Sequence, residues 1–427
     1  MISRRHFRYR FWSGSKMRRP CAFGFSWLSL HEPDHLLFLL MIVLAFCFVL
    51  FTAKWGYLIV ANFLVGDIWA NDFFMIWSSA KFAVSHPVAE IYDNQILHRF
   101  QVDLGDYPTT YRPFVHPPSF LLIILPLAFV SYYVAFVAWS LLTFLAYFIA
   151  ARCKQLGSTA TFLTLFAPAT IITLTFGQTG FLSAALILGG FRLIATRPFL
   201  SGTLFGLASV KPQLGILVPV ALISARLWRT FAAAGATVLI LIIASSMAFG
   251  WSMWPLWLSK LISHADWVAE IKDRYNLTIT ATLIFLGVEP AMARTVQLGV
   301  AAGVAIIIWM CFRRGVTILA AAVLLVGTLL ATPYAVVYDL PMVTSAVVAV
   351  LADKSRTETN LTIAEAGALS LALALPIIVM ETWRLSVVKS VPLLVLFGMI
   401  AWLIFSRGSS ISRTSSRPEQ NRAPNPD

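Results

Sequence analysis

The chain has 427 residues, of which 59% are hydrophobic and only 12% are charged, and its mean hydropathy is +0.80. A soluble core of this length cannot bury so much apolar surface, so the composition predicts an integral membrane protein. The net charge of +13 does not indicate nucleic-acid binding, because the basic residues lie in short clusters between hydrophobic segments and at the two termini. Cys21, Cys47, Cys153 and Cys311 have neither disulfide nor metal-ligand spacing.

About twelve hydrophobic segments follow one another along the chain. Because about 20 apolar residues span a bilayer as a helix, the sequence predicts an all-α, polytopic fold with about 12 transmembrane helices, within a range of about 10 to 13. The segments are 36–55, 119–151, 159–176, 180–196, 199–211, 213–226, 230–250, 291–312, 316–333, 337–351, 363–381 and 389–406. The basic head 1–35 and the Ser-, Arg- and Pro-rich segment 407–427 are predicted to be cytoplasmic tails, the second of them disordered, on either side of a membrane domain of residues 36–406.

The distribution of charge predicts the orientation of the chain. With the N-terminus in the cytoplasm, 21 of the 32 Lys and Arg residues fall inside and 12 of the 19 Asp and Glu residues fall outside. We therefore expect a multi-pass membrane protein with both termini cytoplasmic. The long connections 56–118 and 251–290 then face the periplasm and are the places where a site can be built.

The first of these loops contains the sequence NDFFMIWSSAKFAVSHP. Its apolar residues at helical spacing predict amphipathic interfacial helices in the first outward loop; they are Phe73, Ile76, Trp77, Ala80 and Val84. Asp72 stands at the head of this run. It is interpreted either as the N-cap of the helix or as a general base acting on a hydroxyl nucleophile, and the two roles are compatible.

Further polar residues stand at predicted outer ends of helices. They are Arg112 and His116 in YRPFVHPPSF, Gln178 in FGQTGF, Lys211 in ASVKPQLG, and Tyr334, Tyr338 and Asp339 in ATPYAVVYDL. Each has a simpler interpretation: a headgroup anchor, a tight turn, a lysine reaching the outer surface, or a local cap. Lys211 is the least ordinary, because it precedes a proline near membrane depth, where charges and broken helices are tolerated mainly beside a polar cavity.

Five segments in the same order resemble the bacterial members of glycosyltransferase family 87. They are DFFMIWSSAKFAVSHPVAEIYD, HPPSFLLIILPLAFV, GQTGFLSAALILGG, LSGTLFGLASVKPQLGILVPVALI and ATPYAVVYDL, and the resemblance runs from about residue 66 to about residue 350. The resemblance implies a GT-C membrane fold and a hexosyltransferase, of the polyprenyl-phosphate-mannose-dependent mannosyltransferase group, whose acceptor is a lipid or glycan at the periplasmic face. It implies an acidic base in the first outward loop. Asp72 matches that position, and Asp67 is the competing candidate.

The chemistry needs few groups, because a polyprenyl phosphate is already a leaving group. One base for the acceptor hydroxyl and cationic or hydrogen-bonding groups for the phosphate are sufficient. We expect Lys211, Arg112 and His116 to bind the donor phosphate, and Gln178, Tyr338 and Asp339 to bind hydroxyls of the sugar or the acceptor. No cofactor is expected and no spacing requires a metal, although Asp67, Asp72 and Asp339 leave a divalent cation open.

The alternative is a polytopic transporter or a lipid or glycan flippase, since an intramembrane lysine and proline-broken helices also occur in carriers. The sequence shows no paired halves, and its first outward loop is longer than a carrier needs. A structural membrane protein is a third possibility. In that case Asp72, Lys211 and Gln178 would be replaceable without loss of function.

Overall fold

The computed structural model describes residues 46, 48–58, 60–61, 72–105, 111–153, 155–270, 275–381 and 389–414. Within these ranges the chain is helical and contains no β-strand, apart from one isolated antiparallel bridge between Asn276 and Val336. The all-α prediction is confirmed. The predicted tail 1–35, residues 415–427 and Asp67 lie outside the described residues.

Described helices occupy the predicted hydrophobic segments, and further helices lie in the two long connections 56–118 and 251–290. The last helix, α19, continues past residue 406 to Thr414. With 3₁₀ helices labelled η, they are α2 (Phe73–Ser85), η1 (Val88–Tyr92), α3 (Asn94–Asp103), α4 (Pro118–Ile124), η2 (Leu125–Phe129), α5 (Tyr132–Ala151), α6 (Ser158–Phe166), α7 (Pro168–Phe176), α8 (Gly180–Leu193), α9 (Pro198–Leu207), η3 (Ala208–Val210), α10 (Pro212–Gly215), α11 (Val218–Ser224), α12 (Trp228–Phe249), α13 (Met253–Glu270), α14 (Ile279–Phe285), α15 (Pro290–Arg314), α16 (Ile318–Ala331), η4 (Val337–Asp339), α17 (Pro341–Thr357), α18 (Ile363–Glu381) and α19 (Val391–Thr414). Residues 48–58 are also helical.

Four described helices, α5, α12, α15 and α18, are long and apolar enough to cross a membrane. The pair α6 and α7 makes a fifth if its 42° bend lies within one span. Shorter apolar helices of 10–17 residues accompany them; they are Pro118–Phe129, Gly180–Leu193, Pro198–Val210, Pro212–Ser224, Ile318–Ala331 and Val391–Ser406. Prolines explain several of the breaks, because Pro168 and Pro212 each stand in the first turn of a new helix.

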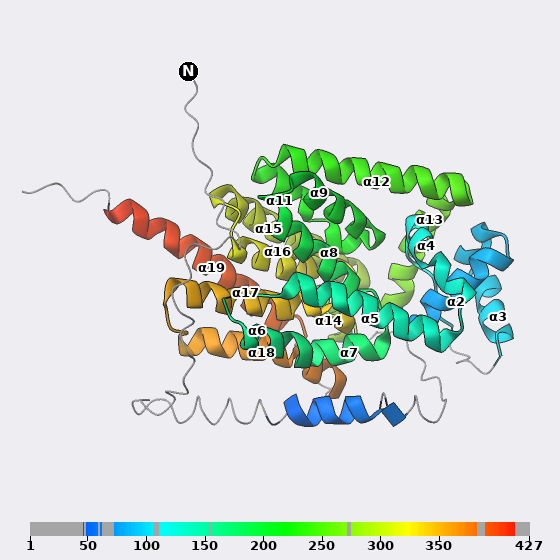
Figure 1. Cartoon of the computed structure of the whole chain (residues 1–427), viewed down its shortest axis with the longest axis horizontal. Coiled ribbons are helices and arrows are strands. Elements are labelled where there is room, and N and C mark those ends of the chain that lie inside the picture. Colours follow the sequence, from blue (N-terminus) through cyan, green and yellow to red (C-terminus); the bar gives the residue numbers. More distant parts are fainter. Residues whose placement is uncertain are drawn as a thin grey trace, which may run out of the picture.

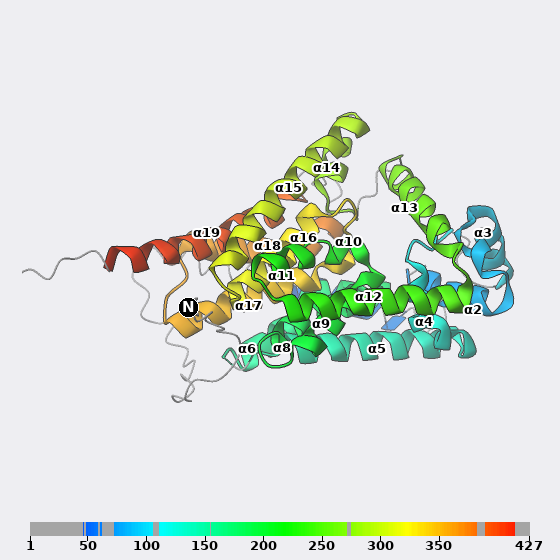
Figure 2. The same ribbon diagram turned by 90° about the horizontal axis from the view of Figure 1, so that it is seen from above.

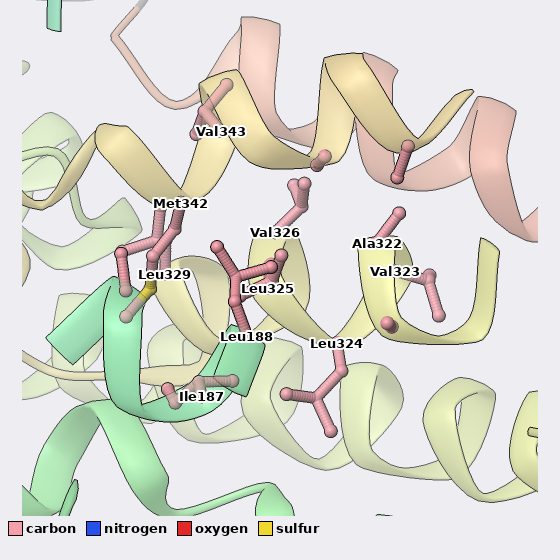
Figure 3. Packing of buried hydrophobic residues seen from close by; sticks show 14 of the residues in the cluster. Ile187, Leu188, Ala322, Val323, Leu324, Leu325, Val326, Leu329, Met342 and Val343 are labelled. Carbon is pink, nitrogen blue, oxygen red and sulfur yellow. The ribbon is translucent and has the colours of Figure 1, made fainter. Parts of the chain in front are cut away.

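The centre of the molecule is α16, in which every residue from Leu319 to Ala331 is buried. A helix that is apolar on all sides must be surrounded by other elements, and α16 packs against α15, α17 and α19. Figure 3 shows Leu325 and Leu329 of α16 beside Leu188 of α8 and Met342 of α17. This core fixes the start of α17, and with it the short helix η4 that precedes α17.

The two predicted outward loops pack against each other. In both views α2, α3, α4 and α13 gather at one end of the molecule and α19 extends from the other (Figures 1 and 2). The indole of Trp257 on α13 donates a hydrogen bond to the Val115 carbonyl oxygen at 3.1 Å. Lys260 on the same helix donates to the Asn94 side chain and, at 3.3 Å, to the Tyr111 hydroxyl.

The structure corrects one expectation for the first loop. The interfacial amphipathic helix predicted at α2 is wrong, because every residue from Phe73 to Ala80 is buried, as is Phe82. The supposed polar face contains Phe74 and Met75, and η1, α4, η2 and α5 surround the helix. Asp72 is therefore held by an internal helix and not by one that lies on the membrane surface.

Candidate active site

Asp72 occupies the N-cap position of α2, but its side chain makes no capping hydrogen bond. Its backbone is helical, with φ −69° and ψ −10°, whereas an N-cap residue normally has extended dihedral angles. The carboxylate instead lies 3.3 Å from the guanidinium of Arg112, and the two side chains are 21% and 27% exposed. The geometry therefore does not support the capping interpretation, and it leaves a carboxylate that can be reached from outside.

The Gly-Gln-Thr-Gly turn between α7 and α8 holds the Asp72 backbone. The Gln178 side-chain amide donates to the Asp72 carbonyl oxygen at 3.3 Å. Gly177 has φ +62°, and a Cβ there would lie 2.7 Å from the Cβ of Phe73. A Cβ on Gly180 would lie 1.8 Å from the carbonyl oxygen of Tyr338. Gly177 is needed for its left-handed φ and for the close approach of the Phe73 side chain, and Gly180 for the close approach of the Tyr338 backbone. Through these two glycines the turn joins the Asp72 segment to the Tyr338 segment.

Lys211 and Asp339 form a buried ion pair, with Nζ 2.5 Å from Oδ1 and side chains that are 3% and 0% exposed. Lys211 stands in the break between η3 and α10, and its ammonium also lies 4.9 Å from the centroid of the Tyr338 ring. The second oxygen of Asp339 accepts the Val336 N–H at 3.2 Å. The Lys211 charge is thus compensated within the protein by a carboxylate and an aromatic face.

The segment of Tyr275 and Leu277, in the second predicted outward loop, holds the Asp339 turn from the other side. The Leu277 N–H donates to the Ala335 carbonyl oxygen at 2.8 Å, and the Val337 N–H donates to the Tyr275 carbonyl oxygen at 3.2 Å. The Thr173 hydroxyl of α7 donates to the Tyr338 carbonyl oxygen at 3.1 Å. The backbone around η4 is therefore fixed by contacts from both sides.

His116 is buried beside this pair. Its ring lies 4.2 Å from the Phe120 ring, and Nδ1 lies 3.1 Å from the Val210 carbonyl oxygen, next to Lys211. Burial, followed by the Lys211 charge, lowers the pKa of His116 to about 3. The imidazole is consequently neutral near pH 7, and the carbonyl partner assigns its proton to Nδ1.

Sequence reasoning missed the contribution of α13. His264 is buried, with its ring 5.4 Å from the Tyr334 ring, and burial together with the Lys260 charge lowers its pKa to about 4. One feature of the sequence could have identified these residues: the spacing of Trp257, Lys260 and His264 places them on one helix face.

The predicted residues therefore form one connected group with an accessible part and a buried part. Asp72 and Arg112 are partly exposed, whereas the remaining members are buried; these are His116, Gln178, Lys211, Tyr338 and Asp339. Among the residues that the structure describes, no three His, Cys, Asp or Glu side chains are grouped so that they could hold a metal ion.

The family model for glycosyltransferase family 87 matches residues 114–333, which is 220 of the 427 residues. The chain belongs to glycosyltransferase family 87. It is therefore a membrane glycosyltransferase that uses a sugar donor and an acceptor. The family 87 match includes His116, Gln178 and Lys211. Gln178 contacts Asp72, and Lys211 contacts Asp339 and Tyr338, and these three partners lie beyond the limits of the match. No curated protein and no solved structure matches the chain.

Proposed function

We propose that this family 87 enzyme transfers a hexose, in the first instance mannose, from a polyprenyl-phosphate sugar to a lipid or glycan acceptor. The observation that supports this best is the Asp72–Arg112 pair, a partly exposed carboxylate beside a partly exposed guanidinium. We place the pair at the periplasmic face of the inner membrane, with both termini cytoplasmic. The proposal includes a GT-C-like fold of about 12 transmembrane helices, in which the shorter apolar helices complete the spans.

In this mechanism Asp72 is the general base. Its carboxylate accepts the proton of the acceptor hydroxyl while that oxygen forms a bond to the anomeric carbon of the sugar. The bond from the anomeric carbon to the phosphate oxygen breaks, and the polyprenyl phosphate leaves with the electron pair. One displacement of this kind inverts the anomeric configuration. A product that retains the configuration would contradict the mechanism.

Arg112 is the group best suited to meet the donor phosphate, because it is the partly exposed cation beside the base. Lys211 is buried against Asp339, and His116 is neutral, so we assign them to the support of this region and only secondarily to the phosphate. Tyr338, whose ring lies 4.9 Å from the Lys211 ammonium, is assigned to a hydroxyl of the sugar or the acceptor.

The test is transfer of radiolabelled mannose from polyprenyl-phosphate-mannose in membranes that contain the wild type, Asp72→Asn or Glu381→Gln. Glu381 is the matched control, because it is also a partly exposed carboxylate in an ion pair, with Lys54 at 2.7 Å. We expect transfer by the wild type and by Glu381→Gln, and a loss of about 100-fold or more for Asp72→Asn at equal expression. An active Asp72→Asn variant would overturn the base assignment.

If the wild type yields no labelled product with this or other lipid-phosphate sugars, the proposed reaction is wrong. Labelled lipid that crosses the membrane unchanged would instead support the flippase. The same membranes can be assayed for both outcomes, so the two functions are separated in one experiment.

A further inference from the structure

A buried glutamine holds the backbone of Arg112. Gln101 on α3 is 1% exposed. Its Oε1 accepts the Arg112 N–H at 3.1 Å, and its Nε2 donates to the Arg112 carbonyl oxygen at 2.9 Å. The same Nε2 donates to the Ser78 hydroxyl at 3.1 Å. Ser78 belongs to α2, the helix that begins next to Asp72, so Gln101 ties the Arg112 segment to the Asp72 helix.

A second buried glutamine holds the backbone of Asp72. Gln178 is 5% exposed, and its Nε2 donates to the Asp72 carbonyl oxygen at 3.3 Å. Its Oε1 accepts the Thr179 N–H at 3.2 Å. Both ends of the amide are therefore engaged with backbone, which differs from the sugar-binding role that the sequence suggested for this residue.

These bonds are placed where the chain has no regular structure of its own. Residues 111–117 form neither helix nor strand, and Asp72 precedes the first residue of α2. Backbone groups in such segments need side-chain partners when they are buried, and a glutamine amide can satisfy one donor and one acceptor at once. Each member of the Asp72–Arg112 pair is thus fixed through its main chain by one amide.

We infer that Gln101 and Gln178 are positioning residues, which set the distance and direction between the Asp72 carboxylate and the Arg112 guanidinium without touching the substrate. The inference rests on the proposed function, because it gives that pair a catalytic purpose. Loss of the Gln101 amide removes the hydrogen bonds that hold the Arg112 backbone, and loss of the Gln178 amide removes the one that holds the Asp72 backbone. The base and the cation then sample wrong geometries, and a displacement of about 1 Å lowers a rate on the order of 10- to 100-fold.

The chain offers a matched control in Gln297. This residue is 3% exposed, its Oε1 accepts the Thr280 N–H at 3.2 Å, and its Nε2 donates to the Leu330 carbonyl oxygen at 2.7 Å. Gln297 therefore makes the same kind of backbone bridge in α15 without bonding to either member of the pair. Methionine has a similar volume to glutamine but lacks the amide that makes these hydrogen bonds. The three variants to compare are Gln101→Met, Gln178→Met and Gln297→Met.

Two measurements on the purified full-length variants test the inference. We expect similar falls in thermal midpoint for all three. We expect kcat to fall on the order of 10- to 100-fold in Gln101→Met and Gln178→Met only, while the donor KM changes by less than about threefold. Equal kcat for Gln101→Met and Gln297→Met, after correction for the folded fraction, would overturn the inference. So would a raised KM at unchanged kcat for Gln178→Met, which is the result for a sugar ligand.

The second measurement does not depend on activity. A carbodiimide couples an added amine to accessible carboxylates, and mass spectrometry measures the rate of this coupling at Asp72. The adjacent Arg112 guanidinium shields the Asp72 carboxylate from the reagent. We expect faster coupling at Asp72 in Gln101→Met and Gln178→Met than in the wild type and Gln297→Met. Unchanged coupling contradicts the positioning role even if the protein has no transferase activity, whereas an inactive wild type with changed coupling contradicts only the proposed function.

Discussion

The two ion pairs of the candidate site contain the same kinds of groups in opposite environments. Asp72 and Arg112 are 3.3 Å apart and 21% and 27% exposed, whereas Lys211 and Asp339 are 2.5 Å apart and almost fully buried. Water screens the first pair, so it contributes little to stability and can exchange a partner for a substrate. The second pair cannot be opened without leaving a bare charge in the interior. The exposed pair is therefore suited to chemistry, and the buried pair to holding the backbone around it.

The largest effect is expected from breaking the buried pair. Lys211→Met leaves the Asp339 carboxylate without its cation, and we expect a loss of about 3–5 kcal/mol in the free energy of unfolding, seen as a lower thermal midpoint in detergent. The double variant Lys211→Met with Asp339→Leu removes both charges and should recover most of the loss. A single variant as stable as the wild type would show that the pair does not support the fold.

The next effect concerns the glycine that connects the two pairs. In Gly180→Ala the new Cβ would meet the Tyr338 carbonyl oxygen at 1.8 Å, so the Tyr338–Asp339 turn must move away. We expect a loss of about 1–3 kcal/mol and reduced transfer. Gly235→Ala is the control, because a Cβ there meets nothing within 4 Å and alanine favours a helix interior. Equal behaviour of the two variants would refute the proposed coupling.

Acid should weaken the buried region through His116. Its folded pKa of about 3 lies below the ordinary value of 6.5, so the unfolded chain binds the proton first as the pH falls. Stability should therefore fall by up to about 1.4 kcal/mol per pH unit below about pH 6.5, and this contribution should stop changing near pH 3. Thermal midpoints at pH 7.5, 6.5 and 5.5 measure it. The slope should flatten in His116→Gln, and an unchanged slope in this variant would contradict the assignment.

The smallest effect on stability is expected for the exposed pair. Arg112→Gln should change the free energy of unfolding by no more than about 1 kcal/mol, while mannose transfer falls strongly. Thermal midpoint and transfer rate are measured on the same preparation. If Arg112→Gln destabilises the protein as much as Lys211→Met does, the two pairs do not differ in the way described above.

The sequence predicted which residues gather but not which of them pair. Hydrophobic segments and basic clusters alternate along the chain, so Asp72, Arg112, Gln178 and Asp339 were expected at the same end of the helices. The partners depend on helix tilt and on contacts across long separations. Lys211 and Asp339, which the sequence assigned to phosphate and to sugar, are 128 residues apart and bind each other.

The missed features have the same physical origin. α2 looked amphipathic from its own spacing, but neighbouring elements such as α4, η2 and α5 pack around it and bury every residue from Phe73 to Ala80. Local periodicity does not record such contacts. Lys260 and His264 lie in a loop that was read only for its length. Their burial is caused by the first outward loop and by Tyr334, which are distant in the sequence.

The packing of α13 on the first predicted outward loop has a consequence for biosynthesis. Asp72 and Arg112 are synthesised early. Trp257 and Lys260, which hydrogen-bond to the Arg112 segment at Val115 and Tyr111, are synthesised later. The Lys211–Asp339 pair also forms later, because it needs both residues. At about 5–20 residues per second, the interval between Asp72 and Asp339 is on the order of tens of seconds. During that time the nascent chain lacks part of the site, which is complete only after Asp339 has been synthesised.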